Sequence, residues 1–256
     1  MSTAAPSLRR LTPPASILLL GAAGAWVGVV AVARHMGPMP GTMGLGVGTF
    51  VAVWVLMMTA MMLPSVTPFA SIYTRSFGER RAVRMAAFAG GYLIVWGLAA
   101  LPAYALAWSA DRLTGSHPSG ATTLAVVIFA LCGIYQLTPL KDRCLARCRS
   151  PIGFAFKLGS YRGRSRDLRA GMYHGAFCFA CCWGLMALLV AFGLMNLVAM
   201  VLLAAVVIGE KTLPWGPGFS RALGVVALVL AVTVVFDPAL APGLHPASQS
   251  GGIGTM

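Results

Sequence analysis

Long apolar runs separated by short polar segments make up most of this chain of 256 residues. Apolar runs of about 20 residues predict α-helices that cross a lipid bilayer. We expect seven such helices, over residues 16–33, 45–66, 86–108, 121–140, 170–192, 197–209 and 222–236. The runs are continuous rather than alternating, which favours helices over the strands of a barrel. The predicted fold class is therefore all-α, a polytopic transmembrane helix bundle with about seven spans.

Composition and charge support a membrane bundle and predict its orientation. The chain is 58% hydrophobic and only 10% charged, whereas a soluble domain carries about a quarter charged residues. Its 19 Lys and Arg residues lie mostly in the segments between the apolar runs. A cytoplasmic N-terminus places all of them except Arg34 and Arg112 on the cytoplasmic side, in agreement with the positive-inside rule. We therefore predict a multi-pass membrane protein whose N-terminus is cytoplasmic.

The polar segments divide the chain into three parts. We expect residues 1–15 to form a cytoplasmic lead, residues 16–237 the bundle with a basic cytoplasmic loop at 141–169, and residues 238–256 a disordered external tail. The first apolar run follows a basic lead and ends in Ala31-Val32-Ala33, so its cleavage as a signal peptide stays open. The basic residues form no patch interleaved with aromatic residues, which argues against nucleic acid as a partner. The expected partner of the apolar surface is the lipid bilayer.

Residues able to bind a metal are concentrated in the run 170–192. His174, Cys178, Cys181, Cys182 and Met186 follow one another there at helical spacings. With about 100° of rotation per residue, they lie along one stripe of the helix surface. A helix that faces only lipid has no need of such a stripe. Metal coordination and the close packing of small polarizable side chains both explain it.

Further candidate ligands are predicted at the same depth, toward the cytoplasmic side. They are Met57, Met58, Met61 and Met62 near the inner end of the second run, Cys144 and Cys148 just past the fourth, and Glu210 at the end of the sixth. Cys144 and Cys148 have i+4 spacing, so their sulfur atoms share one face if the loop begins as a helix. Methionines by themselves more often serve in packing, but here they are expected at the level of several thiols.

Thiolates, thioethers and imidazole select soft or borderline metals, Cu(I) first and Zn(II) second. Cys178 and Cys182 with either His174 or Met186 would suffice for Cu(I). Zn(II) needs a fourth ligand, for which the candidates are Cys181, Cys144, Cys148 and Glu210. Cysteines in apolar spans and in a cytoplasmic loop do not indicate a disulfide framework. Copper is therefore the expected metal, with zinc as the alternative.

Several of these motifs together resemble a bacterial family described as predicted metal-binding integral membrane proteins of unknown function. The resemblance covers residues 51–211 and rests on MMTAMMLP at 57–64, YQLTPLK at 135–141 with the following Cys144 and Cys148, CFACCWGLM at 178–186, Met195-Asn196 and Glu210-Lys211. In that family a glycine usually precedes the double cysteine, where this chain has Ala180, a change between small residues. The resemblance implies a metal-binding polytopic protein of the bacterial inner membrane. It supplies no reaction, and His174 is not part of its pattern.

We interpret the chain as a membrane protein that handles, delivers or inserts copper, and as a binding protein rather than an enzyme. The expected roles are core ligands (Cys178 and Cys182), auxiliary ligands (Cys181, Met61 and Met62) and a transfer pair (Cys144 and Cys148). The partner would be a metal donor or acceptor protein, or a membrane enzyme complex. Two alternatives stay open: a membrane oxidoreductase that uses the thiols or a bound metal, and a non-catalytic subunit of a membrane complex. The oxidoreductase lacks support from paired histidines at haem spacing or from a nucleotide-binding loop.

Overall fold

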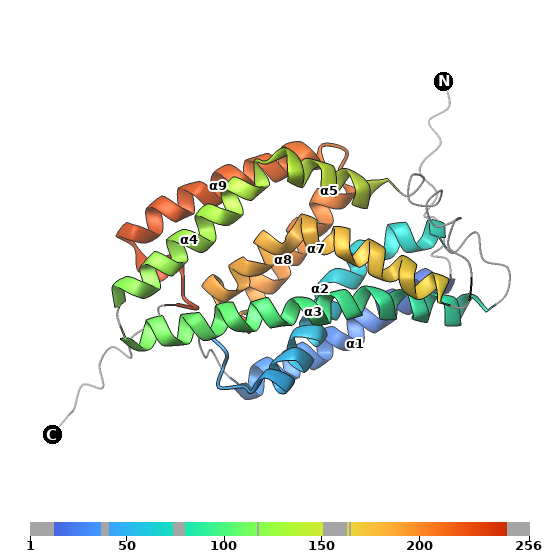
Figure 1. Cartoon of the computed structure of the whole chain (residues 1–256), viewed down its shortest axis with the longest axis horizontal. Helices are drawn as coiled ribbons and strands as arrows, with labels where there is room; N and C mark the ends of the chain where they lie inside the picture. The colour runs from blue at the N-terminus through green and yellow to red at the C-terminus, as the bar shows by residue number, and fades with distance from the viewer. Residues whose placement is uncertain are drawn as a thin grey trace.

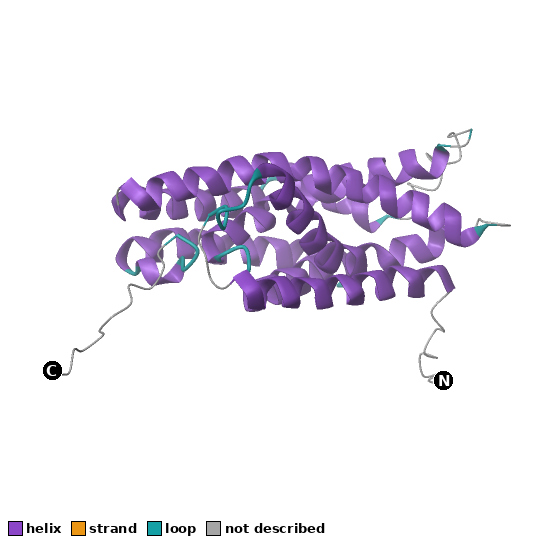
Figure 2. Ribbon diagram, turned by 90° about the horizontal axis from the view of Figure 1, so that it is seen from below, coloured by secondary structure: helices purple, strands orange, loops and turns teal. Residues whose placement is uncertain are grey.

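The computed structural model describes residues 13–36, 41–73, 80–116, 118–150, 163 and 165–244. Within these residues the chain forms eight α-helices, a short 3-10 helix and no strand (Figures 1 and 2). Their bounds are α1 (Pro13–Met36), α2 (Val47–Tyr73), α3 (Arg81–Ser116), α4 (Pro118–Gln136), α5 (Pro139–Arg149), α7 (Arg166–Phe192), α8 (Leu197–Thr212), α9 (Gly216–Phe236) and η2 (Pro238–Leu240). The prediction of an all-α chain is confirmed for the described residues.

Six helices, α1, α2, α3, α4, α7 and α9, are long and apolar enough to cross a membrane. Helix α8 is also apolar but has only 16 residues. That corresponds to about 24 Å, less than the hydrocarbon core of about 30 Å. The described helices thus supply six candidate spans, and α8 would cover most of the thickness without completing a seventh. The count of seven and the orientation of the N-terminus stay predictions.

Helix α7 lies at the centre of the bundle and contacts α3, α4, α5 and α8 (Figure 1). Its contact with α3 is close because a glycine of each helix faces backbone atoms of the other helix. A Cβ atom at Gly91 of α3 would lie 2.0 Å from the carbonyl oxygen of Leu168, and one at Gly171 of α7 would lie 1.9 Å from that of Phe88. Small residues allow membrane helices to approach in this way. The close approach lets the hydroxyl of Tyr92 on α3 lie 2.9 Å from the sulfur of Cys178 on α7.

The expected basic loop at 141–169 begins as a helix that is part of the bundle. Thr138 caps α5 by accepting a hydrogen bond from the N–H of Lys141 at 3.3 Å, and Pro139 takes the first turn, where its missing N–H costs nothing. Cys144 and Cys148 both lie on the buried face of α5, as their i+4 spacing predicts for a helix. Helix α5 packs on α7 and α8. Residues 151–162 of the expected loop lie outside the described residues.

The beginning of the expected disordered tail is packed on the bundle. Residues Pro238–Leu240 form η2, Leu244 is buried, and the N–H of Gly243 donates to the carbonyl oxygen of Ala191 at 2.9 Å. This contact depends on glycine, since a Cβ atom at Gly243 would lie 2.2 Å from the nitrogen of Gly193. The prediction of disorder is therefore wrong for residues 238–244. Residues 1–12 and 245–256 lie outside the described part of the chain.

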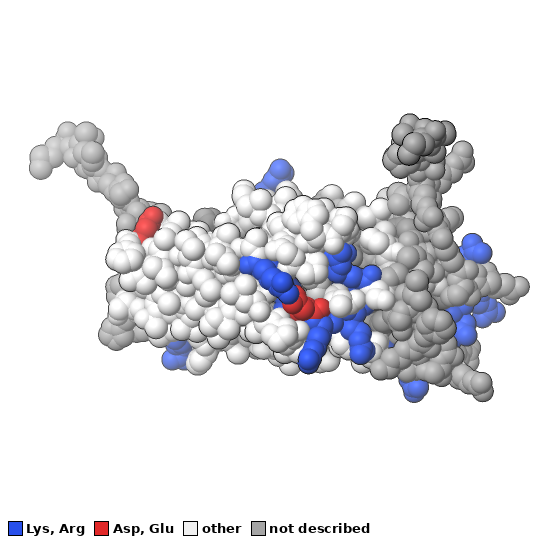
Figure 3. Space-filling model, turned by 90° about the horizontal axis from the view of Figure 1, so that it is seen from above, with Lys and Arg blue, Asp and Glu red and all other residues white. Residues whose placement is uncertain are grey.

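Hydrogen bonds between side chains show which helix ends lie together. Arg84 of α3 and Tyr73 of α2 donate to Asp167 at the start of α7, at 3.0 and 2.7 Å. At the other end of α3, Thr42 donates from its hydroxyl to Asp111 at 2.5 Å. On the face shown in Figure 3, most Lys and Arg side chains lie between the middle of the bundle and one end, and the other end carries little charge. This distribution agrees with spans that share one basic end.

Candidate metal centre

Four cysteines form one buried group where α5 packs against α7. The Sγ atom of Cys181 lies 3.2 Å from that of Cys182 and 3.7 Å from that of Cys148. Cys181 also donates from its Sγ to the carbonyl oxygen of Cys178 at 3.2 Å, and the Cys178 side chain interacts with those of Cys181 and Cys182. All four are free thiols. We call Cys148, Cys178, Cys181 and Cys182 the thiol cluster.

The sulfur of Cys178 is approached by polar groups from other helices. The hydroxyl of Tyr92 on α3 lies 2.9 Å from it, and Nζ of Lys211 on α8 lies 3.0 Å from it. The same Nζ donates to the hydroxyl of Ser65 on α2 at 3.0 Å. An ammonium at this distance forms a charge-assisted contact with a thiolate, and the thiolate is the form that binds a metal.

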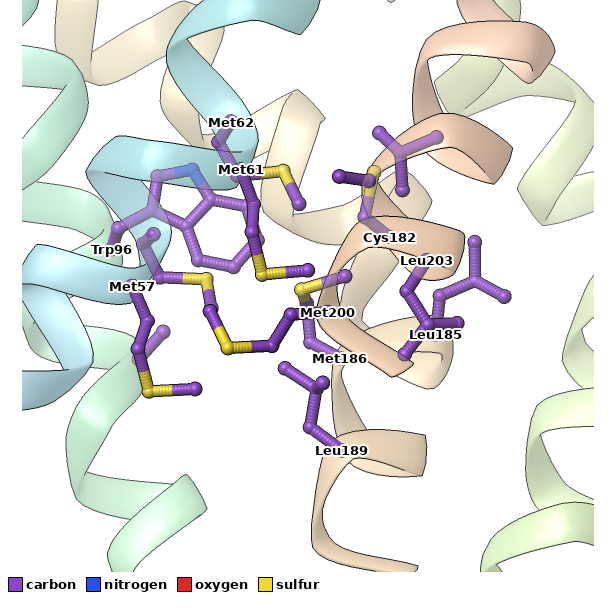
Figure 4. Close-up of a cluster of buried hydrophobic side chains, with 14 of the residues drawn as sticks. Met57, Met61, Met62, Trp96, Cys182, Leu185, Met186, Leu189, Met200 and Leu203 are labelled. Atoms are coloured by element: carbon purple, nitrogen blue, oxygen red, sulfur yellow. The ribbon is translucent and has the colours of Figure 1, made fainter. Parts of the chain in front are cut away.

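Buried methionines adjoin the thiol cluster. Figure 4 shows side chains that point into the same part of the interior from α2 (Met57, Met61, Met62), α7 (Met186) and α8 (Met200), and we call these five the methionine cluster. None of them is more than 2% exposed. Met58 of α2 is also fully buried. Cys182 belongs to the same group of side chains in Figure 4, so it links the methionine cluster to the thiol cluster.

His174 precedes Cys178 by one helical turn and is packed among aromatic rings. Its ring centroid lies 4.3 Å from that of Phe69, with the two planes 18° apart, and 6.1 Å from that of Tyr92. The side chain is buried. Stacking thus holds the imidazole beside the tyrosine that contacts Cys178.

Lys141 and Glu210 form a buried ion pair beside the thiol cluster. Nζ of Lys141 donates to Oε2 of Glu210 at 2.7 Å and to the carbonyl oxygen of Cys181 at 2.5 Å. Nε2 of Gln136 donates to the other carboxylate oxygen at 2.7 Å. Burial lowers the pKa of Lys141. Glu210 and the nearby Cys182 raise it by more than burial lowers it, so the pKa lies above its usual value. Both carboxylate oxygens of Glu210 are engaged, and binding a metal would require it to give up one of these bonds.

The end of α8 is held in place by α5. The guanidinium of Arg149 donates to the carbonyl oxygens of Glu210 and Leu213, both at 2.5 Å. These bonds satisfy carbonyl groups that the end of a helix leaves without partners. Together with the Lys141–Glu210 ion pair, they fix the last turn of α8 and therefore the position of Lys211.

Cys144 and Cys132 are buried but make no sulfur–sulfur contact within the described residues. Cys144 lies against Tyr135 of α4. Cys132 on α4 packs next to Gly184, with its Sγ 3.5 Å from the position of a Cβ atom there. The expected pair is thus divided, because Cys148 faces Cys181 and Cys144 faces α4.

Five residues around the clusters were not predicted from the sequence, namely Ser65, Tyr92, Lys141, Met200 and Lys211. Lys141 and Lys211 lie in the motifs that carry the resemblance, but we counted both with the basic residues of the cytoplasmic side. These motifs and their position at the border of an apolar run were the signals that could have identified the two lysines. Tyr92 and Met200 lie inside apolar runs, where an aromatic or a methionine side chain looks like packing.

The donors that the structure brings together are of the kinds that soft metals prefer. Among the described residues, no group of three or more His, Cys, Asp or Glu side chains is arranged to hold a metal ion. A structural zinc site needs four such ligands. Cu(I) binds with as few as two thiolates and accepts thioethers. Cys178 and Cys182, with methionines beside them, are a donor set of the kind that Cu(I) accepts.

Comparison with curated proteins and with solved structures finds no match for this chain. Comparison with protein families finds a match over residues 51–234 to a family described as PpoB2, copper chaperone. The matched segment contains the thiol cluster, the methionine cluster and the Lys141–Glu210 ion pair. It covers well over half of the chain, and the chain therefore belongs to the PpoB2 copper chaperone family.

Proposed function

We propose that this chain is a membrane-embedded copper chaperone that binds Cu(I) at the thiol cluster and passes it to an acceptor protein or a membrane enzyme complex. Cys178 and Cys182 are the core ligands. Cys181 and the methionine cluster assist them, and Cys148 on α5 is the thiol that exchanges copper with the partner. Copper is the cargo of this protein rather than a permanent part of it.

The observation that carries the proposal is the contact between thiols of two helices beside a group of buried methionines. Cys148 from α5 reaches within 3.7 Å of Cys181 on α7, although 33 residues separate them in the sequence. Packing alone does not require soft donors from separate helices to gather at one place. A copper carrier does, because thiolate and thioether sulfurs bind Cu(I) more strongly than other protein groups do.

The lengths of the helices support a position near one membrane face. Helix α3 has 36 residues, about 54 Å, and exceeds a bilayer core of about 30 Å. The shorter α4 and α8 both end beside the thiol cluster, since Gln136 and Glu210 at their ends are hydrogen-bonded to one another. Helix α5 covers the cluster and exposes Arg143 and Arg147. Basic residues of this kind mark the cytoplasmic side, so we assign the site to the cytoplasmic leaflet of the bacterial inner membrane.

Metal analysis of the purified full chain in detergent tests the proposal. The wild-type protein is loaded with Cu(I) under reducing conditions, separated from free metal, and assayed for copper per chain. We expect stoichiometric copper, and loss of most of it in the double variant Cys178→Ser, Cys182→Ser. The matched control is Cys132→Ser, which changes a buried thiol outside the thiol cluster and should keep its copper.

Each result of this experiment decides between the candidates. A wild-type chain that retains no Cu(I), or a double variant that retains as much as the control, contradicts the copper site. A metal-free protein that copurifies with a membrane complex supports the non-catalytic subunit instead. Transfer itself is tested by mixing the loaded chain with a copper-free acceptor and measuring the metal on each protein after separation.

A membrane oxidoreductase is the second candidate, and the 3.7 Å separation of the Cys148 and Cys181 sulfurs favours it. Two thiols at this distance need little movement to form a disulfide, whose S–S bond is about 2.05 Å. The Cys148→Ser variant separates the two functions. It should bind copper normally if Cys178 and Cys182 are the core ligands. A redox wave in the wild type that disappears in this variant would support the oxidoreductase.

A further inference from the structure

Lys211 directs its ammonium into the bundle rather than toward water. Lysines near the ends of membrane helices usually extend their charged group outward to the interface. Here Nζ lies 3.0 Å from the sulfur of Cys178 and 3.0 Å from the hydroxyl of Ser65. Both of these partners are buried, with exposed fractions of 0% and 5%. A positive charge in this position needs a negative partner nearby.

The negative partner of Lys211 is sulfur, not a carboxylate. Within the described residues the ion pairs of carboxylates involve other cations, and the adjacent Glu210 is paired with Lys141. The groups that accept from its Nζ are the sulfur of Cys178 and the hydroxyl of Ser65, and of these two the sulfur is the one that readily ionises. The Lys141–Glu210 pair is neutral in sum, so the ammonium of Lys211 is the charge that the thiol cluster has to balance.

Charge balance then distinguishes metals by their valence. Cu(I) held by two thiolates carries one negative charge, which the Lys211 ammonium neutralises. A divalent ion held by the same two thiolates is already neutral, and the ammonium beside it would stay uncompensated. In a site of two thiolates, Cys181 keeps the hydrogen bond from its Sγ to the carbonyl oxygen of Cys178 and assists the pair without adding a negative charge. An uncompensated charge in a buried site is unfavourable.

Building on the copper site proposed above, we infer that Lys211 is a specificity-determining residue that makes the Cys178–Cys182 pair prefer a monovalent over a divalent soft cation. Lys211 does not bind the metal. It acts through its charge, held against Cys178 by the anchoring of the α8 end on α5.

The test compares Cu(I) and Cd(II) affinities of the purified full chain. Cu(I) affinity is measured by competition with a coloured Cu(I) chelator, and Cd(II) affinity by the absorbance of its thiolate complex. Lys211→Met should lower the ratio of Cu(I) to Cd(II) affinity by at least about tenfold, equivalent to ~1.4 kcal/mol. Lys211→Gln, which keeps a hydrogen-bond donor without the charge, should behave in the same way and covers the case in which the methionine variant does not fold.

Two further variants separate charge from structure. Lys211→Arg keeps the charge and should keep the wild-type ratio. The double variant Arg221→Gln, Asp142→Asn removes a neutral ion pair that contacts neither the thiol cluster nor Lys211, and it should also keep the ratio. Unchanged ratios in both Lys211→Met and Lys211→Gln would overturn the inference, as would a Lys211→Arg variant that loses the preference. If the wild-type chain binds no Cu(I) at all, the proposed function itself fails, which is a different result.

Discussion

The contact between α3 and α7 can be tested with two neighbouring glycines of α3. A Cβ atom at Gly91 would lie 2.0 Å from the carbonyl oxygen of Leu168 and 3.0 Å from the nitrogen of Met172, both backbone atoms of α7. A Cβ atom at Gly90 would have nothing within 4 Å. Gly91→Ala and Gly90→Ala therefore add the same methyl group to adjacent residues of one helix. At Gly91 the methyl group meets the backbone of α7, and at Gly90 it meets open space.

The expected difference follows from the geometry. A carbon atom approaches a carbonyl oxygen to about 3.3 Å at closest, so the two helices must separate by more than about 1 Å at Gly91. Such overpacking costs about 1–3 kcal/mol. Both variants gain the same helix propensity, up to about 1 kcal/mol for alanine over glycine, and this gain cancels in the comparison. At about 2–4 °C per kcal/mol for a chain of this size, Gly91→Ala should melt roughly 2–12 °C below Gly90→Ala.

Thermal unfolding of the purified chain in detergent, followed by circular dichroism, measures this difference. A second reading comes from thiol labelling in the folded state, because displacement of α3 moves Tyr92 away from Cys178. Labelling of Cys178 should be faster in Gly91→Ala than in Gly90→Ala. Equal melting temperatures and equal labelling rates for the two variants would refute the close approach of α3 and α7.

Three other substitutions test contacts around the site. Glu210→Gln leaves the buried Lys141 without its counter-ion and should lower the free energy of unfolding by about 3–5 kcal/mol, measured by thermal unfolding. A double variant that removes both charges should lose less. A Glu210→Gln variant as stable as the wild type would contradict a buried ion pair. Asp167→Asn weakens the bonds from Arg84 at the start of α7 and should cost about 1–3 kcal/mol, visible as faster proteolysis of the chain at that end; proteolysis at the wild-type rate would count against the contact. Asn196→Ala removes the N-cap of α8 and should cost about 1 kcal/mol, with faster hydrogen exchange in its first turn and unchanged copper binding.

The sequence by itself determined the helical class and the positions of most helices. Hydrophobicity and helical period are local properties of the chain, so runs such as 170–192 could be recognised without knowing their neighbours. The helical start of the segment after Thr138 is also local, because a cap and a proline in the first turn act on the residues that follow them. The stripe that contains Cys178, Cys181 and Cys182 was predicted from the same spacing.

Predictions from the sequence were wrong for segments whose structure depends on contacts with distant residues. The tail at 238–244 has a composition typical of disorder, yet Gly243 bonds to Ala191 and holds it on the bundle. Lys141 counts as a charged loop residue in any local assessment. It is buried because Glu210, 69 positions further along, supplies its counter-ion.

Tertiary structure alone decided how the candidate ligands are combined. Spacing placed Cys144 and Cys148 together, but the packing of α5 on α7 brings only Cys148 to Cys181. The tertiary structure also directs the Lys211 side chain toward Cys178, because Arg149 and Lys141 anchor the end of α8. Spacing within one helix fixes which residues share a face. The charge and donor set of a site between helices depend instead on how α5, α7 and α8 pack against one another, which links residues far apart in the sequence.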